Sequence, residues 1–370
     1  MTNNIYFIAA DYVNGISIYK SLKALKVSGE IIVFNTSGRN MAGKVFPELP
    51  IVNGITDGEK LMNYLLSFDK RINKYLFLTH EMFHATLWEN RERLKTHNVI
   101  YHIGNQNPEL ILDKRKFLGN LKENSDVPVP TSYSLKHVES IKYPVFVKPK
   151  SSFFGDKKTS LEKAVIETKT ELENYFQKVE KHGADKDDVE IQELLSTQTR
   201  DNISVSGWYE NGFHRFYQTQ KILQHPPKRG NGDVVKLMQL NPILEKHVLE
   251  VMKILDYQGP FEAEFVKEKK GSQYKLIEIN PRFWMQHGLI EQLSGHLLVA
   301  RYIGVSAMAP VTKYQYWMYT TIVPIQLAKL RLNYIPYLLR RDVYKPISFT
   351  QSGKFLLKYL KQVVFISRVI

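Results

Sequence analysis

The stretch Tyr-Lys-Leu-Ile-Glu-Ile-Asn-Pro-Arg-Phe, residues 274–283, predicts a β-strand that runs directly into a polar site. Glu278 and Asn280 are two residues apart, so their side chains point to the same face of the strand. A carboxylate and an amide oxygen are ligands that Mg²⁺ prefers. Pro281 ends the strand because it cannot donate to a ladder, and Arg282 adds a planar fork suited to phosphate.

A second acidic pair precedes this strand. Glu262 and Glu264 share one face of a short strand, and the polar segment 267–273, with one glycine, predicts a hairpin turn. An antiparallel hairpin would bring Glu264 close to Glu278. Together with Asn280, these carboxylates predict a site for one or two Mg²⁺ ions; a plain hairpin with a charged, solvated face is the alternative.

Composition narrows the function classes. The chain has 370 residues, enough for two or three domains, and no cysteine, which excludes disulfides and a thiolate nucleophile. Its net charge of +14 favours anionic partners. No zinc-finger spacing or aromatic-basic RNA motif is present, so nucleic acid is not expected. The N-terminus lacks the basic region of a signal peptide, and no apolar run is long enough to span a bilayer, so the expected location is the cytoplasm.

The first part of the chain predicts a small α/β domain. An apolar strand, a helix and a second strand give a parallel, right-handed β-α-β unit at residues 5–10, 16–27 and 31–34. Further strands are expected at 75–78 and 99–101, and helices at 58–68 and 87–96. Substrate could dock at the carboxyl ends of the strands, near residues 11–15 and 79–81. His80, Glu81 and His84 are interpreted as ordinary helix-start residues, because no third metal ligand is evident.

The middle of the chain combines phosphate-binding candidates with hairpins. Asp113 is expected to cap a helix that starts at Lys114. Lys148 ends an apolar strand before the small-residue loop 151–158, whose backbone N–H groups could hold phosphates, although a lone strand-end lysine is more often at the surface. A helix is expected at 161–182, a strand at 189–195, a hairpin turn at Asn211-Gly212 and a basic loop at 220–232.

In chain order these features form a series: Lys114, Lys148, loop 151–158, segment 192–195, Lys221, Glu264 and segment 278–282. This series resembles the ATP-grasp superfamily over roughly residues 113–305. It looks closest to the carboxylate–amine ligase branch, which includes D-alanine–D-alanine ligase and D-aspartate ligase-like enzymes. The resemblance implies an α/β (α+β) fold with a Rossmann-like pre-ATP-grasp domain (1–112), an ATP-grasp domain (113–310, with a small lid at about 140–200) and a basic helical C-terminal extension (311–370).

The resemblance also implies roles for individual residues. Lys114 and Lys148 would hold the α- and β-phosphates of ATP, and Lys221 would reach the γ-phosphate. Arg282 would steady the transferring phosphoryl group. Adenine would lie against Gln192, Glu193 and Leu195, ribose would meet Asp201 or Asn202, and Mg²⁺, which Mn²⁺ can replace, would be held by Glu264, Glu278 and Asn280. His287 and Gln286 could line a substrate pocket, or His287 could simply start a helix.

The implied reaction is ATP-dependent amide formation through an acyl phosphate, with ADP and phosphate as products. The substrates would be a small carboxylate and an amine, such as a sugar acid or cell-surface precursor joined to an amino acid. Two amino acids form an alternative pair. A phosphotransferase, or a non-catalytic ATP-binding protein, remains a further alternative.

The segment from residue 311 onward is basic and aromatic. Its ten lysines and arginines are Lys313, Lys329, Arg331, Arg340, Arg341, Lys345, Lys354, Lys358, Lys361 and Arg368. Three interpretations stay open. The segment could cover the ligase domain, form a homodimer contact, or lie on the inner face of an anionic membrane as a peripheral contact. Packing is favoured, because amphipathic stripes usually face a core.

Overall fold

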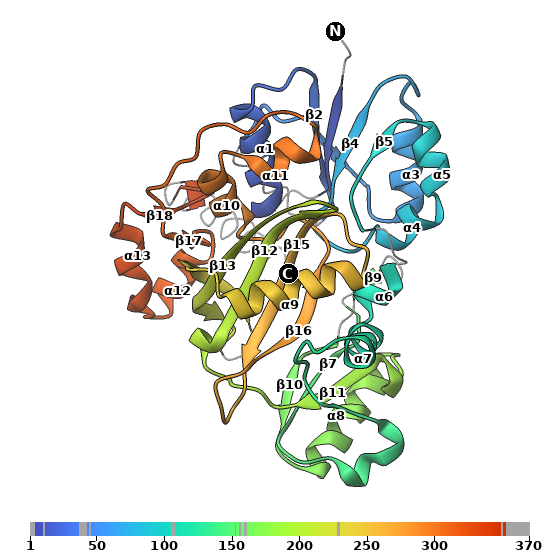
Figure 1. The fold of residues 1–370 in the computed structure, drawn as a ribbon, viewed down its shortest axis with the longest axis vertical. Helices are drawn as coiled ribbons and strands as arrows, with labels where there is room; N and C mark the ends of the chain where they lie inside the picture. Colours follow the sequence, from blue (N-terminus) through green and yellow to red (C-terminus); the bar gives the residue numbers. More distant parts are fainter. Residues whose placement is uncertain are drawn as a thin grey trace, which may run out of the picture.

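The computed structural model describes residues 4–9, 12–36, 43, 46–104, 108–151, 153–154, 157–158, 161–227, 230–348 and 351–352. The first part is a five-stranded parallel sheet of order β3-β2-β1-β4-β5, flanked by helices (Figure 1). Its strands are β1 (Ile5–Ile8), β2 (Glu30–Asn35), β3 (Ile51–Asn53), β4 (Lys74–Phe77) and β5 (Val99–Ile100). Its helices are α1 (Val13–Ala24), α3 (Gly58–Leu66), α4 (His84–Glu89) and α5 (Arg91–Thr96).

The central strand of this sheet, β1, has hydrophobic side chains on both of its faces. β1 is buried on both faces: Tyr6 and Ile8 belong to one hydrophobic cluster, and Ile5 and Phe7 to another. Because β1 and β2 flank α1 in the chain and pair in parallel, the predicted parallel β-α-β unit is confirmed. The helix expected at 87–96 is two helices instead, because the chain turns at Asn90 between α4 and α5.

A small antiparallel sheet has the order β10-β7-β11-β6 and is drawn at the bottom of Figure 1; we refer to it as the lid, the name that the resemblance gave this region. Its elements are β6 (Ser132–Tyr133), the 3-10 helix η1 (Leu135–Ser140), β7 (Val145–Pro149), β10 (Ala164–Ile166), α8 (Lys169–Lys181), the 3-10 helix η2 (Lys186–Asp188) and β11 (Val189–Glu193). The strands β8 (Phe153–Phe154) and β9 (Lys157–Lys158) pair with each other. The helix expected from residue 161 begins only at Lys169, because Val165 and Ile166 pair with β7 and Thr168 caps α8.

The central element is a seven-stranded sheet of order β16-β15-β12-β13-β14-β17-β18. Its strands are β12 (Asn202–Glu210), β13 (Phe213–His225), β14 (Asn231–Met238), β15 (Gly259–Lys267), β16 (Tyr274–Asn280), β17 (Tyr316–Met318) and β18 (Val343–Tyr344). Both predicted hairpins are confirmed: Glu210 pairs with Phe213 around Asn211-Gly212, and β15 pairs with β16.

Helices cover this sheet and join it to the first domain. α6 (Pro108–Leu112), α7 (Lys114–Asn124) and α9 (Pro242–Ile254) share one hydrophobic cluster with β12, β15 and β16. Asp113 caps α7 by accepting from the N–H groups of Arg115 and Lys116, as predicted. α10 (His287–Ser294) and α11 (Leu297–Tyr302) pack against α1. The 3-10 helix η3 (Thr199–Asp201) precedes β12.

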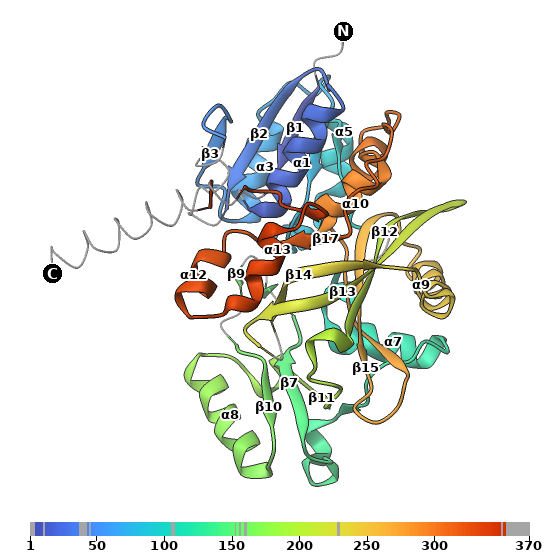
Figure 2. The same cartoon turned by 90° about the vertical axis from the view of Figure 1, so that its left-hand side faces the viewer.

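The C-terminal segment differs from the expected helical extension. It contains α12 (Val323–Ala328), the 3-10 helix η4 (Leu332–Tyr334) and α13 (Ile335–Leu339), but also β17 and β18, which extend the central sheet. Trp317 and Met318 are buried in β17, and this burial favours pairing with β14 over a helix. α12 and α13 form a lobe on one side of the molecule (Figure 2). Residues 353–370, with four of the ten predicted cations, lie outside the described residues.

Among the described residues, no helix is long and apolar enough to cross a bilayer.

Candidate active site

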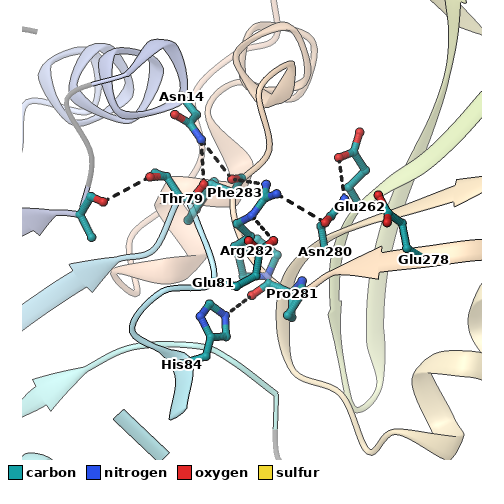
Figure 3. Close-up of polar contacts among 12 residues, drawn as sticks. Asn14, Thr79, Glu81, His84, Glu262, Glu278, Asn280, Pro281, Arg282 and Phe283 are labelled. Atoms are coloured by element: carbon teal, nitrogen blue, oxygen red, sulfur yellow. Dashed lines mark hydrogen bonds and ion pairs between the residues drawn. The ribbon is translucent and has the colours of Figure 1, made fainter. Parts of the chain in front are cut away.

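The register of β15 and β16 places the predicted acidic residues side by side. Glu264 lies opposite Glu278, and Glu262 lies opposite Asn280. The Asn280 amide donates to Glu262 at 3.2 Å and to Glu264 at 3.3 Å. Figure 3 shows Glu262, Glu278 and Asn280 converging at the end of this hairpin. Because the side-chain period of a strand is two, one register brings all four groups to a single face.

Lysines from three elements surround these carboxylates. Lys221 Nζ on β13 lies 3.0 Å from Glu264, and Lys114 Nζ at the start of α7 lies 3.7 Å from Glu278. Lys148 Nζ on β7 donates to the Ile277 carbonyl at 3.1 Å. Lys148 is buried, with only 2% of its surface exposed, so it is not the surface-exposed lysine that is common at the end of a strand. Burial lowers the pKa of Lys148 to about 7.

The carboxylates respond to this environment in opposite ways. Burial and the neighbouring Glu264 raise the pKa of Glu262 to about 8. Burial alone would also raise the pKa of Glu278, but Lys163 and Lys114 outweigh it and hold that pKa below its ordinary value. At neutral pH the face therefore keeps Glu278 charged, while Glu262 favours its neutral form.

Side chains of the first domain contact the turn after β16 (Figure 3). Arg282 Nε donates to the Glu81 carboxylate at 2.7 Å, and the His84 ring contacts the Pro281 carbonyl at 3.1 Å. Arg282 also donates to Asn280 Oδ1 at 3.4 Å. His84 does start α4, as the sequence interpretation has it, but Glu81 and His84 also have contacts that this interpretation did not include. Both position the turn that carries Arg282.

An open cavity of about 810 Å³ lies between the lid and the central sheet. One part of its wall is apolar, and the other carries Lys148, Lys163, Lys221, Glu264 and Glu278. The apolar part comes from both sides of the cleft and includes Phe146, Val165, Leu195, Val266 and Ile277. A flat apolar ligand with a polyanionic tail would match this division of the wall.

Most of the residues expected near the nucleotide line this cavity, namely Lys148, Gln192, Glu193, Leu195, Lys221, Glu264 and Glu278. The Glu193 carboxylate accepts from Lys275 Nζ at 2.6 Å and from the Thr131 N–H at 2.8 Å. For the ribose, Asn202 lines the cavity, whereas the Asp201 carboxylate accepts a hydrogen bond from Ser196. The loop 151–158 lies partly outside the described residues.

A second cavity of about 1140 Å³ opens toward the first domain. It shares Lys163, Lys221, Asn231, Glu264 and Glu278 with the first cavity, so the two spaces meet over the carboxylates. Its remaining wall consists of Tyr12, Asn14, Thr79, His80, Glu81, Gly232, Glu262, Asn280, Arg282, Met285 and Gln286. The predicted docking region at the ends of the parallel strands is therefore part of this wall, although Asp11 lies outside the described residues.

Three further residues are Lys114 and His287, which the sequence analysis singled out, and Lys163, which it did not. Lys114 lines a smaller neighbouring cavity with Ser151, Glu278 and Asn280 rather than either of the large ones. Lys163, which the sequence reasoning missed, lines both large cavities. A charged residue next to a short edge strand carries no local signal of this role. His287 starts α10 and is fully buried, so of the two expectations the helix start is the one the structure shows.

The donor set fits a magnesium ion that arrives with a nucleotide. Within the described residues, no group of three or more histidine, cysteine, aspartate or glutamate side chains is arranged to hold a metal ion. Glu264 and Glu278 offer hard oxygen atoms on one face, whereas Asn280 turns its amide N–H toward Glu264, so the three do not form a complete cage. Mg²⁺ commonly keeps water and phosphate oxygens among its ligands, so an incomplete set of this kind suits it.

A parallel α/β domain, a small antiparallel lid and a large antiparallel sheet with paired carboxylates at the cleft together define the ATP-grasp fold. The chain belongs to the family described as carbamoyl-phosphate synthase L chain, ATP binding domain, whose model matches residues 120–313, just over half of the sequence. This match covers most of the region 113–310 that the sequence assigns to ATP-grasp and ends three residues beyond it.

Solved structures share the fold. N5-carboxyaminoimidazole synthetase from Staphylococcus aureus, complexed with ADP, is 16% identical, with a TM-score of 0.65 over 90% of this chain and 87% of that chain. L-amino acid ligase from Bacillus licheniformis is 17% identical, with a TM-score of 0.57 over 82% of this chain and 74% of that chain. A comparison with curated proteins finds no match.

Proposed function

We propose that the protein is a Mg²⁺- and ATP-dependent carboxylate–amine ligase that forms an amide through an acyl phosphate. The observation that carries this proposal is the meeting of two cavities over Glu264 and Glu278. One cavity has the wall that a nucleotide needs, and the other is a separate space for further substrates. A single phosphoryl group placed between them would be in reach of both.

The residues around this meeting point suit phosphoryl transfer. Lys148 and Lys114 would contact the α- and β-phosphates, and Lys221 the γ-phosphate. Glu264, Glu278 and Asn280 would hold Mg²⁺, which supplies charge neutralisation to the phosphates when bound. Arg282, held by Glu81, would face the transferring group from the second cavity. Positioned cations are the main catalytic lever in phosphoryl transfer, since charge spreads over the transferring oxygens.

The proposed reaction has two steps. A carboxylate oxygen of the first substrate attacks the γ-phosphorus, the bond to the β-phosphate oxygen breaks, and ADP leaves. The acyl phosphate now has a good leaving group. The amine of the second substrate attacks the acyl carbon, inorganic phosphate departs, and the amine nitrogen loses a proton. Enclosure between the lid and the sheet would keep water away from the acyl phosphate.

Two substrate classes suit the second cavity. Its wall offers Arg282 and Lys163 for a carboxylate, and Glu262, Tyr12, Asn14 and Gln286 for polar or amine groups. A sugar acid joined to an amino acid and a pair of amino acids both meet these requirements. The fold similarity to an L-amino acid ligase favours including amino acid pairs.

The test is release of ADP and phosphate with Mg²⁺-ATP across a panel of amino acids and uronic acids, with mass spectrometry of the products. Wild type is compared with Glu278→Gln and with the control Glu123→Gln, which changes an exposed carboxylate on α7. We expect turnover that needs both a carboxylate and an amine, persists in the control and falls at least about a hundredfold in Glu278→Gln.

Other outcomes would contradict the proposal. AMP and pyrophosphate would overturn the acyl-phosphate route. A stable phosphorylated product formed without an amine would indicate a phosphotransferase. Nucleotide binding without turnover for any pair would indicate a non-catalytic ATP-binding protein.

A further inference from the structure

The C-terminal lobe exposes an unusual share of apolar surface. Nine large hydrophobic side chains are exposed in the described part of the chain, and five of them lie within residues 325–339. The exposed fractions are 82% for Leu330, 78% for Leu339 and 59% for Leu332. Single exposed leucines are normal on a protein surface, but a cluster of this kind usually marks an interaction site. We call Ile325, Leu330, Leu332, Ile335 and Leu339 the leucine patch.

The opposite side of the lobe is well anchored, so the exposure is built into the fold. Tyr334 is buried and donates from its hydroxyl to Asp233 on β14 at 2.6 Å. Val323 packs with Val234 and Met318 in one hydrophobic cluster. The described part of the tail therefore packs on the central sheet, as the packing interpretation expected, but the residues of the leucine patch stay exposed. Figure 1 shows α12 and α13 at the edge of the molecule.

The backbone supports the same conclusion. Leu330 has a φ of +57°, in the left-handed region that side-chain-bearing residues rarely adopt. This conformation brings a leucine to the tip of the turn between α12 and η4, where it is almost fully exposed. This backbone conformation costs free energy, and the Leu330 side chain is not buried within the chain. We therefore expect the side chain to contact something other than this chain.

The charged residues near the leucine patch indicate which kind of partner it would bind. Residues 292–370 contain eleven lysines and arginines and a single acidic residue, Asp342. Arg340 pairs with Asp342 at 2.6 Å, which neutralises that one carboxylate. Lys329 and Arg341 are exposed beside the leucine patch. An apolar patch bordered by cations matches an anionic lipid surface, where leucines enter the interface and cations contact headgroup phosphates. A nucleic acid would use the cations but would gain nothing from exposed leucines.

We propose that the lobe of residues 323–345 docks the protein onto an anionic lipid bilayer through the leucine patch, Lys329 and Arg341. The docking lobe adjoins the site: Asp233, which anchors Tyr334, directly follows Asn231 and Gly232, and these two line the second cavity. Docking would therefore hold the substrate cavity close to a membrane surface.

The experiment is sedimentation of the full chain with large unilamellar vesicles. One preparation is phosphatidylcholine alone, and the other contains about one-third phosphatidylglycerol, a strongly anionic surface. Wild type is compared with Leu330→Ser/Leu332→Ser/Leu339→Ser and with Lys329→Gln/Arg341→Gln. The matched control is Ile243→Ser/Lys246→Gln, which changes an exposed apolar residue and an exposed cation on α9.

We expect binding to the anionic vesicles only, weakened by salt. Each cation near an anionic surface contributes about a fivefold gain in binding, so loss of two should weaken binding at least about tenfold. Loss of the three leucines should weaken it by a similar factor. The control should bind like wild type. All variants change exposed side chains, and circular dichroism would verify that each is folded.

Three outcomes would overturn the proposal. Wild type could fail to bind the anionic vesicles. Binding could be equal in wild type and the leucine variant, which would place the contact elsewhere on the chain. Alternatively, the leucine variant could change a dimer into a monomer in light scattering while vesicle binding is absent, which would make the patch a contact between copies.

Discussion

At the scale of single residues, the site depends on charges that would be costly if left alone. Lys148 lies on a strand and Arg282 in a turn; a carbonyl group holds the first and a carboxylate of opposite charge holds the second. In a poorly solvated cleft, an unpaired charge is strongly disfavoured. The stability of this region therefore depends on complete pairs.

The Glu81–Arg282 pair gives the first prediction. Glu81→Gln should lower the free energy of unfolding by about 3 kcal/mol, because the mostly buried Arg282 guanidinium loses its charged partner. Urea denaturation measures the change. As a control, Asp69→Asn breaks the exposed Asp69–Arg71 pair and should have a much smaller effect. Equal effects of the two substitutions would show that the Glu81–Arg282 pair is effectively solvated.

Asp233 gives a pH-dependent prediction. Burial raises its pKa to about 7, well above the ordinary value for aspartate. The folded protein therefore retains a proton that the unfolded chain releases near pH 4, so this group lowers stability progressively as the pH rises from about 4 to 7. Asp233→Asn removes the effect and can still accept from Tyr334. From pH 4 to pH 8, the variant should gain about 2–4 kcal/mol relative to wild type in urea unfolding. A difference that does not vary with pH would contradict the assignment.

At the scale of elements, the long hairpin of β12 and β13 forms the middle of the central sheet and carries Lys221. Two of its glycines have different physical purposes. Gly212 adopts a φ of +81° in the turn, with open space around the position of a Cβ. At Gly207, a Cβ would lie 1.9 Å from the Arg215 carbonyl oxygen of the neighbouring strand.

Substitution of these two glycines should destabilise the protein by unequal amounts. Gly207→Ala should destabilise the protein by more than about 3 kcal/mol, because backbone in the middle of the sheet must move. Gly212→Ala should cost only about 1–2 kcal/mol, the strain of a left-handed alanine. Chemical denaturation of both variants measures the comparison. A similar cost at the two positions would mean that the strands separate easily around Gly207.

At the scale of the whole molecule, the nucleotide cavity has walls from two bodies, the lid and the central sheet. A ligand that contacts both should stabilise the folded protein as a unit. With free ADP and Mg²⁺ at about a hundred times the dissociation constant, stability should rise by about 2.7 kcal/mol, and the melting temperature by several degrees. Scanning calorimetry measures this effect without turnover.

Removal of the metal provides the matching control. EDTA should remove most of the ADP-dependent rise in melting temperature, and Glu278→Gln should lose the Mg²⁺-dependent part while Glu123→Gln retains it. Stabilisation of equal size with EDTA would show that ADP binds without the carboxylate pair. No stabilisation in wild type would contradict a nucleotide site in this cavity.

The sequence by itself determined the local features. Alternation of apolar residues predicts the strands, Asn211-Gly212 predicts a hairpin, and a spacing of two places Glu278 and Asn280 on one face. These features depend on neighbours along the chain, and the structure has them where they were expected. Local signals failed where tertiary pairing overrode them, as at Val165 and Ile166 in β10 and at Trp317 in β17.

Only the tertiary structure decided what lies across the cleft. The contact of Glu81 with Arg282 joins residues about two hundred positions apart, and Lys163, just before a short edge strand, lines both cavities. No local pattern encodes such contacts, because they arise from the packing of three separate bodies. The same holds for the leucine patch. The sequence shows a basic, apolar tail, but whether its leucines are buried depends on which face of the lobe packs against β14.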